Sequence, residues 1–158
     1  MKYFTAFNQA CSRGVIPLKA SFRADFDATA KVLLIRVGEG FSDDSMAALY
    51  AVNRKLSAAT GAKVGIADLS WVTEFGLSAQ GIRKLASQPD MTEPRIIIAP
   101  QVCVYGLLRM FQSLSEGSRP LLQIVHTIQE AFSALGIRFP RFAPWLTPAL
   151  LQIQSAIS

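Results

Sequence analysis

The sequence predicts an α/β domain with a mixed, mainly parallel sheet of about five strands and helices packed against it. Three observations predict this class. Short apolar runs alternate with stretches of helical spacing, the first two apolar runs are separated only by a tight turn, and capping residues precede the helical stretches. Strands joined through helices run parallel, so the order predicts an initial β-hairpin followed by parallel strands.

The hairpin is predicted over residues 21–37. Residues 21–26 alternate apolar and polar side chains, which is the spacing of a half-buried strand. Residues 27–30 supply a tight turn, and residues 31–37 return as a run rich in aliphatic side chains.

The first helix follows this hairpin. Ser42 stands before two aspartates, which favour a helix N-terminus by capping and by charge. Phe41 and Met46 occupy the two positions of a hydrophobic staple around that cap. Gly61 suits the end of the helix, because glycine adopts the left-handed conformation that often terminates helices.

Three further strand and helix pairs complete the predicted domain. The strands are expected at residues 64–69, 95–99 and 121–125, and a polar turn is expected after the first of them. The helices are expected to open at Ser78, after Pro100, and at Thr127, where Glu130 completes a capping box. The middle helix should turn an apolar stripe inward, formed by Val104, Leu107, Leu108, Phe111 and Leu114.

The charge distribution divides the chain into three parts. We expect an N-terminal basic arm at residues 1–20, the domain at 21–137, and a Pro- and aromatic-rich extension with a short terminal helix at 138–158. The whole excess of five positive charges lies in the two end segments, while the 11 remaining basic residues balance the 11 acids. A neutral central domain disfavours nucleic acid as a partner.

The composition also favours a particular cellular location. The N-terminus shows no secretory pattern, and no apolar run approaches the ~20 residues needed to cross a bilayer, so we expect a cytoplasmic protein. Cys11 and Cys103 lie far apart in the sequence, and we expect no disulfide framework.

The sequence contains none of the usual catalytic, cofactor or metal motifs. It lacks a Gly-rich phosphate loop and the clustered His, Cys or carboxylate ligands of a metal site. His126 is the single histidine, and its place between a strand and a helix cap favours a structural role. We therefore expect no catalytic residue, no cofactor and no metal, and a protein that is not an enzyme.

Two stretches of the sequence, residues 68–82 and residues within 96–136, resemble a known bacterial family. The residues that carry the resemblance are Asp68-Leu69-Ser70, Val72, Phe75, Ser78-Ala79, Gly81-Ile82, Ile96-Ile-Ile-Ala-Pro100, Tyr105-Gly106, Arg109-Met110-Phe111-Gln112, Glu130-Ala131 and Leu135-Gly136. Together they look like the STAS domain of SpoIIAA-like proteins, and more closely like the group described as STAS/SEC14-like. The resemblance implies a STAS-like fold and regulatory work through a protein partner, as in anti-sigma-factor antagonists.

The resemblance also gives Ser78 two candidate roles. In the family the serine that opens this helix is phosphorylated by a partner kinase, and a phosphate is tolerated at a helix N-terminus. Here Leu77 stands where the family has an aspartate, which favours a plain helix cap over a phospho-acceptor.

Three groups of residues are candidate contact surfaces. Trp71 is an anchor for a partner or a lid over the strand ends. Tyr105 and Arg109, one helical turn apart, could hold an anion or a partner's carboxylate, or could belong to a solvated face in which Arg109 pairs with an acid such as Glu116.

The C-terminal aromatics Phe139, Phe142 and Trp145 form the third group. They lie beside Arg138 and Arg141, a composition that suits a membrane surface, the domain's own sheet or a dimer contact. The partners that stay open are a protein, a second copy of the chain, and an apolar ligand or membrane surface. The competing function is accordingly a carrier or sensor of an apolar small molecule or lipid.

Overall fold

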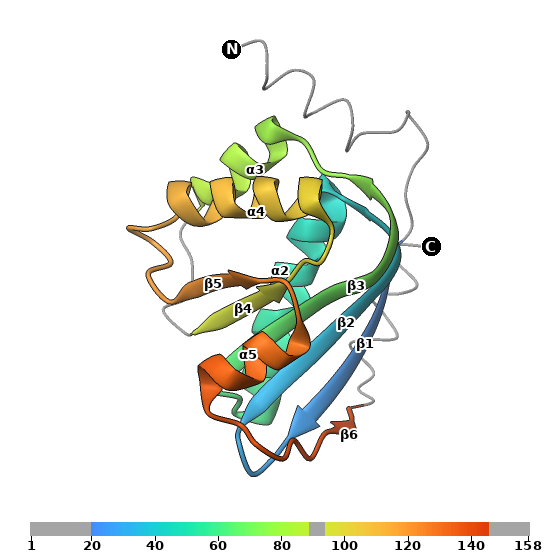
Figure 1. Cartoon of the computed structure of the whole chain (residues 1–158), viewed down its shortest axis with the longest axis vertical. Coiled ribbons are helices and arrows are strands. Elements are labelled where there is room, and N and C mark those ends of the chain that lie inside the picture. Colours follow the sequence, from blue (N-terminus) through green and yellow to red (C-terminus); the bar gives the residue numbers. More distant parts are fainter. Residues whose placement is uncertain (1–19, 89–93, 146–158) are drawn as a thin grey trace.

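The computed structural model describes residues 20–88 and 94–145 of the 158-residue chain. The described residues form one sheet of six strands, and four helices pack against it (Figure 1). In chain order these are β1 (Ala20–Asp27), β2 (Val32–Ser42), α2 (Asp43–Thr60), β3 (Val64–Gly76), α3 (Ala79–Ala86), β4 (Arg95–Ile98), α4 (Val102–Leu114), β5 (Leu122–Val125), α5 (Ile128–Leu135) and β6 (Ala143–Pro144). The predicted α/β class is confirmed.

The strands lie in the order β5-β4-β3-β2-β1-β6. The strands β2, β3, β4 and β5 run parallel to one another, whereas β1 is antiparallel to both β2 and β6. The sequence does not predict β6. Its two residues belong to the C-terminal extension and pair with Asp25 and Phe26 of β1, so the sheet has six strands rather than about five.

The strand β3 is much longer than the sequence predicts. We expected it to end at Leu69 and a polar turn to follow, but it continues to Gly76 and stays paired with β2 as far as Ser42. Two shifts of register interrupt this pairing. The expected turn is wrong because the continued edge of β2 offers hydrogen-bond partners and the register shifts accommodate the irregular side-chain pattern.

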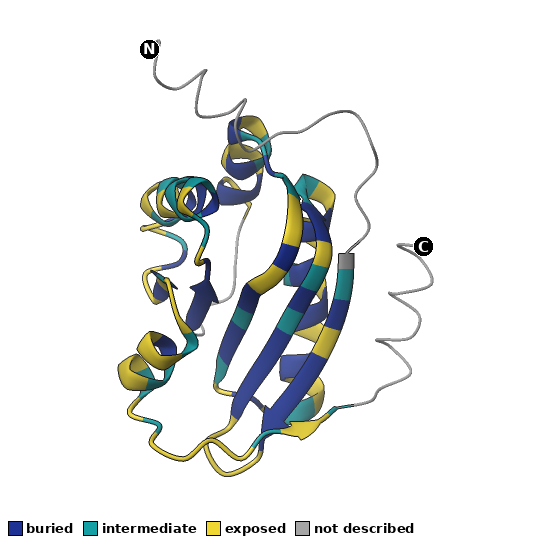
Figure 2. Ribbon diagram, turned by 45° about the vertical axis from the view of Figure 1, so that its right-hand side comes forward, coloured by how far each residue is buried: buried dark blue, intermediate teal, exposed yellow. Residues whose placement is uncertain are grey.

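Helices cover the two faces of the sheet unequally. The larger core lies under α2, α3 and α4, whose inward residues Leu49, Ile82 and Leu108 are buried there. The smaller core, on the other face, lies under α5 alone. Figure 1 shows α5 in front of the sheet and α2 behind it, and Figure 2 shows buried central strands beside helices with exposed outer sides.

The ends of the first helix follow the predicted chemistry. The Ser42 hydroxyl accepts from the Ser45 backbone N–H at 3.4 Å, and the Ser45 hydroxyl accepts from the Ser42 N–H at 3.1 Å. Phe41 and Met46, the predicted staple pair, are both fully buried. Gly61 ends the helix with φ of 71°, a conformation that costs glycine little.

Two local expectations need correction. Leu114, expected to face inward from α4, is 51% exposed because it stands at the last residue of that helix. At α5 the Thr127 hydroxyl caps the Glu130 N–H at 3.1 Å, but the Glu130 carboxylate accepts from the His126 N–H at 2.8 Å instead of returning to Thr127. The predicted capping box is therefore formed in part: the Glu130 side chain binds the N–H of His126, the residue before the N-cap, instead of that of Thr127.

Several expectations fall partly or wholly outside the described residues. These are the structure of the arm at 1–19, Pro89 itself, which was expected to end the helix that is complete by Ala86, and the terminal helix expected within 146–158. Cys103 on α4 is disulfide-bonded, contrary to the expectation for the cysteines. The other half of this disulfide lies outside the described residues. Of the helices in the described ranges, none combines the length and apolarity needed to cross a bilayer.

Candidate interaction surface

One face of the sheet presents polar and aromatic side chains beyond the end of α5. Leu34 of β2 lies in the smaller core, and Arg36, two residues further along the strand, points to the same face. Arg36 is paired in register with Arg23 of β1 and Asp68 of β3, and directly paired residues share a face. Within the described chain, α5 is the one helix in the core on this side. We call this surface the open face; it comprises Arg23, Asp25, Arg36, Asp68, Ser70 and Trp71.

A buried carboxylate holds the arginines of the open face in place. Asp25 is 3% exposed, and its Oδ2 accepts from Arg36 Nη1 at 2.9 Å. Its Oδ1 lies 3.6 Å from Arg23 Nε, while the Arg23 side chain remains 66% exposed. Arg36 is thus positioned by a charge-assisted hydrogen bond, and Arg23 stays available at the surface.

Trp71 is displayed by the bulged part of β3. Before it, Asp68 Oδ1 accepts from the Ser70 hydroxyl at 2.5 Å and from the Ser70 N–H at 2.9 Å, which fixes the backbone at the register shift. Trp71 then pairs with Gly38, and it is 69% exposed. A Cβ on Gly38 would come within 2.7 Å of the Ser21 hydroxyl, so a side chain there would require the Ser21 side chain to move.

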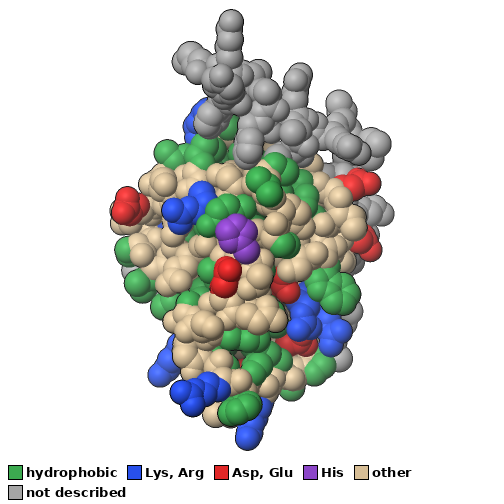
Figure 3. All heavy atoms as spheres, viewed as in Figure 1, with side chains coloured by type: hydrophobic (Ala, Val, Ile, Leu, Met, Phe, Trp, Pro, Cys, Tyr) green, Lys and Arg blue, Asp and Glu red, His purple; other side chains and the backbone are tan. Residues whose placement is uncertain are grey.

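The exposure of Trp71 supports its role as an anchor rather than a lid over the strand ends. A lid would bury much of the indole against the domain, whereas most of this side chain faces solvent. On the face seen in Figure 3, acidic and basic side chains gather beside an apolar one at the right. Tryptophan and arginine are the residue types most enriched among energetically important interface contacts.

Tyr105 and Arg109 of α4 have separate neighbours. The Tyr105 ring stacks on the His126 ring, with centroids 3.9 Å apart and planes at 18°. Arg109 Nη1 donates to the Gln112 Oε1 at 2.7 Å, and Gln112 Nε2 in turn donates to the Leu122 carbonyl at 2.7 Å. Both residues therefore have partners within the domain, and their surface joins α4 to the end of β5.

Ser78 sits at the junction of α2 and α3. Its hydroxyl accepts from the Gly81 N–H at 3.0 Å, which makes it the N-cap of α3. The same hydroxyl donates to Asp43 Oδ2 at 2.6 Å, and the Ser78 N–H donates to Asp43 Oδ1 at 2.9 Å. The sequence indicates the cap but not Asp43, which stands 35 residues earlier.

The three C-terminal aromatics differ in their surroundings. Phe142 stacks on Phe132 of α5 at 5.9 Å, and Trp145 meets Phe26 edge to face at 5.9 Å. Both therefore cover this domain's own cores. Phe139 is 85% exposed.

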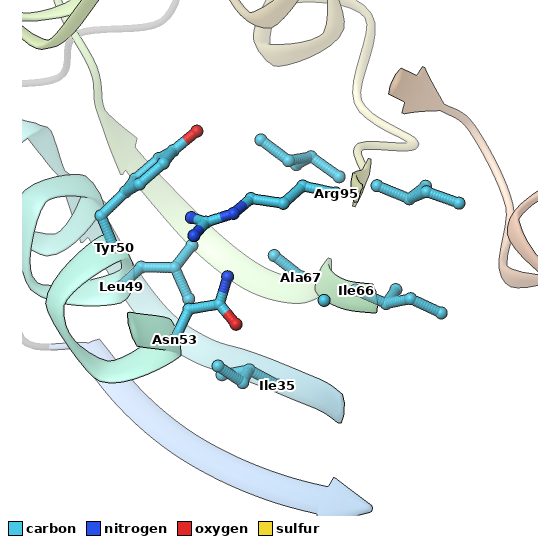
Figure 4. A pocket seen from close by; sticks show the side chains of 10 residues that line it. Ile35, Leu49, Tyr50, Asn53, Ile66, Ala67 and Arg95 are labelled. Carbon is cyan, nitrogen blue, oxygen red and sulfur yellow. The ribbon is translucent and has the colours of Figure 1, made fainter. Parts of the chain in front are cut away.

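A polar cluster under α2, formed by Arg95, Tyr50 and Asn53, was not predicted from the sequence. The Arg95 guanidinium lies 4.9 Å from the Tyr50 ring and is 6% exposed, although arginine is rarely buried. Figure 4 shows it reaching from β4 towards Tyr50 and Asn53 of α2. The cavity beside it measures about 20 Å³, which is room for a single water molecule. The sequence feature nearest to Arg95 is Pro94, which indicates where the strand starts but not that the Arg95 side chain is buried.

Across residues 20–88 and 94–145, no three His, Cys, Asp or Glu side chains gather as a metal site would require. No protein-family model matches the chain, and no curated protein matches it either.

Proposed function

We propose that this protein is a non-catalytic regulatory module that binds a protein partner through the open face. The observation that carries this proposal is the position of Trp71. The indole is 69% exposed beside a glycine, on a part of the sheet that the described helices leave uncovered, and Arg23 and Arg36 lie in the adjoining row.

The open face suits protein recognition because its polar groups are already arranged. Asp25 orients Arg36 before any partner arrives, so less side-chain entropy is lost on binding. Trp71 offers a large apolar contact with few rotatable bonds, and the charged side chains around it can form the polar rim of an interface. A STAS-like regulatory role, suggested by the resemblance in sequence, would use a surface of this kind.

The competing function, a carrier of an apolar molecule, has less support. Ligand sites for small molecules usually enclose about 300–1,000 Å³. The cavity beside Arg95 and Tyr50 is far smaller, at about 20 Å³. A hollow of about 620 Å³ beside Val32 and Val64 has the size of a ligand site, but it is open at the surface and lined by Asp27, Arg138 and Arg141 as well as by apolar side chains. Native mass spectrometry of freshly purified protein separates the two functions, because a carrier would retain a lipid-like mass.

The test of the proposed function uses a photo-crosslinking amino acid at position 23 in the native cells, because Arg23 is exposed on the open face and this choice leaves Trp71 in place. The crosslinked protein is identified, purified and titrated against the full chain by calorimetry. The Trp71→Ala variant should bind about tenfold or more weakly, whereas Arg83→Gln, which removes an exposed cation of α3, should bind as the wild type does. Equal affinity of Trp71→Ala and wild type would reject the open face as the binding site.

A further inference from the structure

A second surface lies at the end of the sheet opposite Trp71. A hollow of about 620 Å³ opens between the β1–β2 turn, the start of β3, and the end of α5 with the segment that follows it. Val32, Val64, Leu135 and Ile137 supply its apolar lining, and Arg138, Phe139 and Arg141 also line it. From Val64 to Trp71 the strand advances seven residues, so this hollow and the open face are separated by about 23 Å along β3.

The charge at this end is one-sided. Arg138 and Arg141 are exposed, and so are Lys31 and Lys63, which the Lys63 N–H to Lys31 carbonyl hydrogen bond of 2.8 Å holds side by side at the foot of the sheet. Figure 3 shows Lys and Arg side chains gathered at the lower end of the molecule with apolar side chains between them. Arg138 and Arg141 line the hollow itself. Lys31 and Lys63 add exposed cations at the same end of the sheet, where Lys31 Nζ lies 6.0 Å from the centre of the Phe26 ring.

The one acid among the described residues that line this hollow, Asp27, leaves the two arginines there in excess. Asp27 is 2% exposed, its Oδ1 accepts from the Thr29 and Ala30 N–H groups at 2.9 Å, and its Oδ2 accepts from the Arg141 N–H at 2.8 Å. All three bonds are to the backbone. Asp27 therefore fixes the segment around Arg141 through the backbone, while the pKa of Asp27 is lowered most by the Ala30 N–H and least by the charge of Arg141.

Phe139 adds an apolar group to this basic end. It stands one residue after Arg138 and two before Arg141, and it is 85% exposed, whereas Phe142 and Trp145 in the same segment pack on the domain. An exposed aromatic ring flanked by cations is the composition of surfaces that insert into the boundary between lipid headgroups and acyl chains.

We propose that this end, comprising Lys31, Lys63, Arg138, Phe139 and Arg141, docks on the surface of an anionic phospholipid membrane. The cations meet the lipid phosphates, and the Phe139 ring enters the acyl boundary. A second copy of the chain fits less well, because a self-complementary contact would bring the arginines of one copy against those of the other. The inference concerns a surface separate from the open face, so it does not depend on the proposed partner binding.

The test is cosedimentation of the full chain with phosphatidylcholine vesicles, with and without admixed phosphatidylglycerol. The expected result is binding that requires phosphatidylglycerol and weakens with salt. The Arg138→Gln, Arg141→Gln double variant should partition roughly thirtyfold less, because each of the two cations contributes about fivefold at an anionic surface. Phe139→Ser should reduce binding severalfold while its urea midpoint stays that of the wild type, because the ring is already in water.

A matched control removes the same charge from the other end of the molecule. Arg83→Gln with Lys84→Gln takes two exposed cations from α3, and it should bind the vesicles as the wild type does. Three results would overturn the proposal: equal binding to both kinds of vesicle, an equal loss in this control, or unchanged binding by Phe139→Ser. A dimer that the Arg138→Gln, Arg141→Gln variant converts to monomers would assign the surface to self-association instead.

Discussion

Ser78 and Asp43 join the N-termini of two helices through two hydrogen bonds, one from the Ser78 N–H and a shorter one from its hydroxyl. The Ser78 hydroxyl donates to Asp43 Oδ2 at 2.6 Å while it accepts from the Gly81 N–H at 3.0 Å. Its proton and an acceptor position are thus both in use. A phosphate on this oxygen would place further negative charge against the Asp43 carboxylate, so modification would loosen the contact between α2 and α3.

Replacing Ser78 should measure the strength of this junction. Ser78→Ala leaves the Gly81 N–H without its cap and removes a donor from Asp43, so we expect a loss of about 1–2 kcal/mol in the free energy of unfolding. Urea denaturation provides the measurement. Ser78→Thr keeps a hydroxyl and should retain most of the stability, and an equal loss in both variants would contradict this account.

Gly81 should be intolerant of a side chain for a reason that is specific to Asp43. In a helix interior, Gly→Ala usually stabilises by about 1 kcal/mol. Here the added Cβ would lie 2.1 Å from the Asp43 carboxyl carbon, so we expect Gly81→Ala to destabilise by about 1–3 kcal/mol. Urea denaturation in the Asp43→Ala background provides the control, since the cost should fall sharply there. A stabilising Gly81→Ala in the wild type would show that the two helices separate easily.

Asp27 should make the domain less stable in acid. Backbone N–H groups, that of Ala30 most strongly and then that of Arg141, lower the pKa of Asp27 below its usual value of 3.8 and outweigh the opposing effect of burial. A depressed pKa contributes stability above the pKa of the unfolded chain, and this contribution is lost as the pH falls through the folded value. The urea midpoint should therefore drop below about pH 4, where the unfolded aspartate takes up its proton.

The Asp27→Asn variant isolates this effect. It should be less stable than the wild type at neutral pH, because the amide nitrogen cannot accept from the Arg141 N–H, and its urea midpoint should decline less in acid. Glu74→Gln, which changes an exposed acid of β3, should follow the wild-type profile. Parallel acid profiles for Asp27→Asn and wild type would contradict the assignment.

The two tryptophans should be distinguishable by fluorescence. Trp71 is 69% exposed, whereas Trp145 packs edge to face on Phe26 and its indole nitrogen is buried. In the Trp145→Phe variant the remaining emission should be red-shifted and readily quenched by acrylamide. In the Trp71→Phe variant it should be blue-shifted and protected. The reverse order would remove the main support for the open face.

Local rules predict the elements of this fold well. The first helix begins and ends where Ser42, the staple pair and Gly61 place it, since capping depends on neighbours in the sequence. The extension of β3 depends instead on β2, which is distant in the chain. Ser70, Thr73 and Glu74 resemble a turn when they are read alone, and the register shifts that accommodate them appear only when the two strands are paired.

The candidate sites divide in the same way. Trp71 was recognisable from its position between a strand and a helix, although its exposure and its neighbours Gly38 and Arg36 were not. Asp43 was interpreted as an acid that stabilises the first turn of a helix. This local interpretation was sufficient by itself, so the contact of Asp43 with Ser78 was not predicted. The basic end was predicted only in part, because Lys31 and Lys63 join the C-terminal arginines through the fold rather than through the sequence.

The unequal covering of the sheet determines which part of the domain should open first. In α5 only Ala131 is buried, whereas α2 buries seven residues, of which four belong to the larger core. Local unfolding of α5 should therefore need much less free energy than global unfolding, and its amides should exchange with deuterium well before those of α2. Each opening uncovers an aliphatic strip on β2, β3 and β4, formed by Val32, Leu34, Ile66, Ile96 and Ile98. The tendency of this protein to aggregate is then governed by an eight-residue helix rather than by the stability of the whole domain.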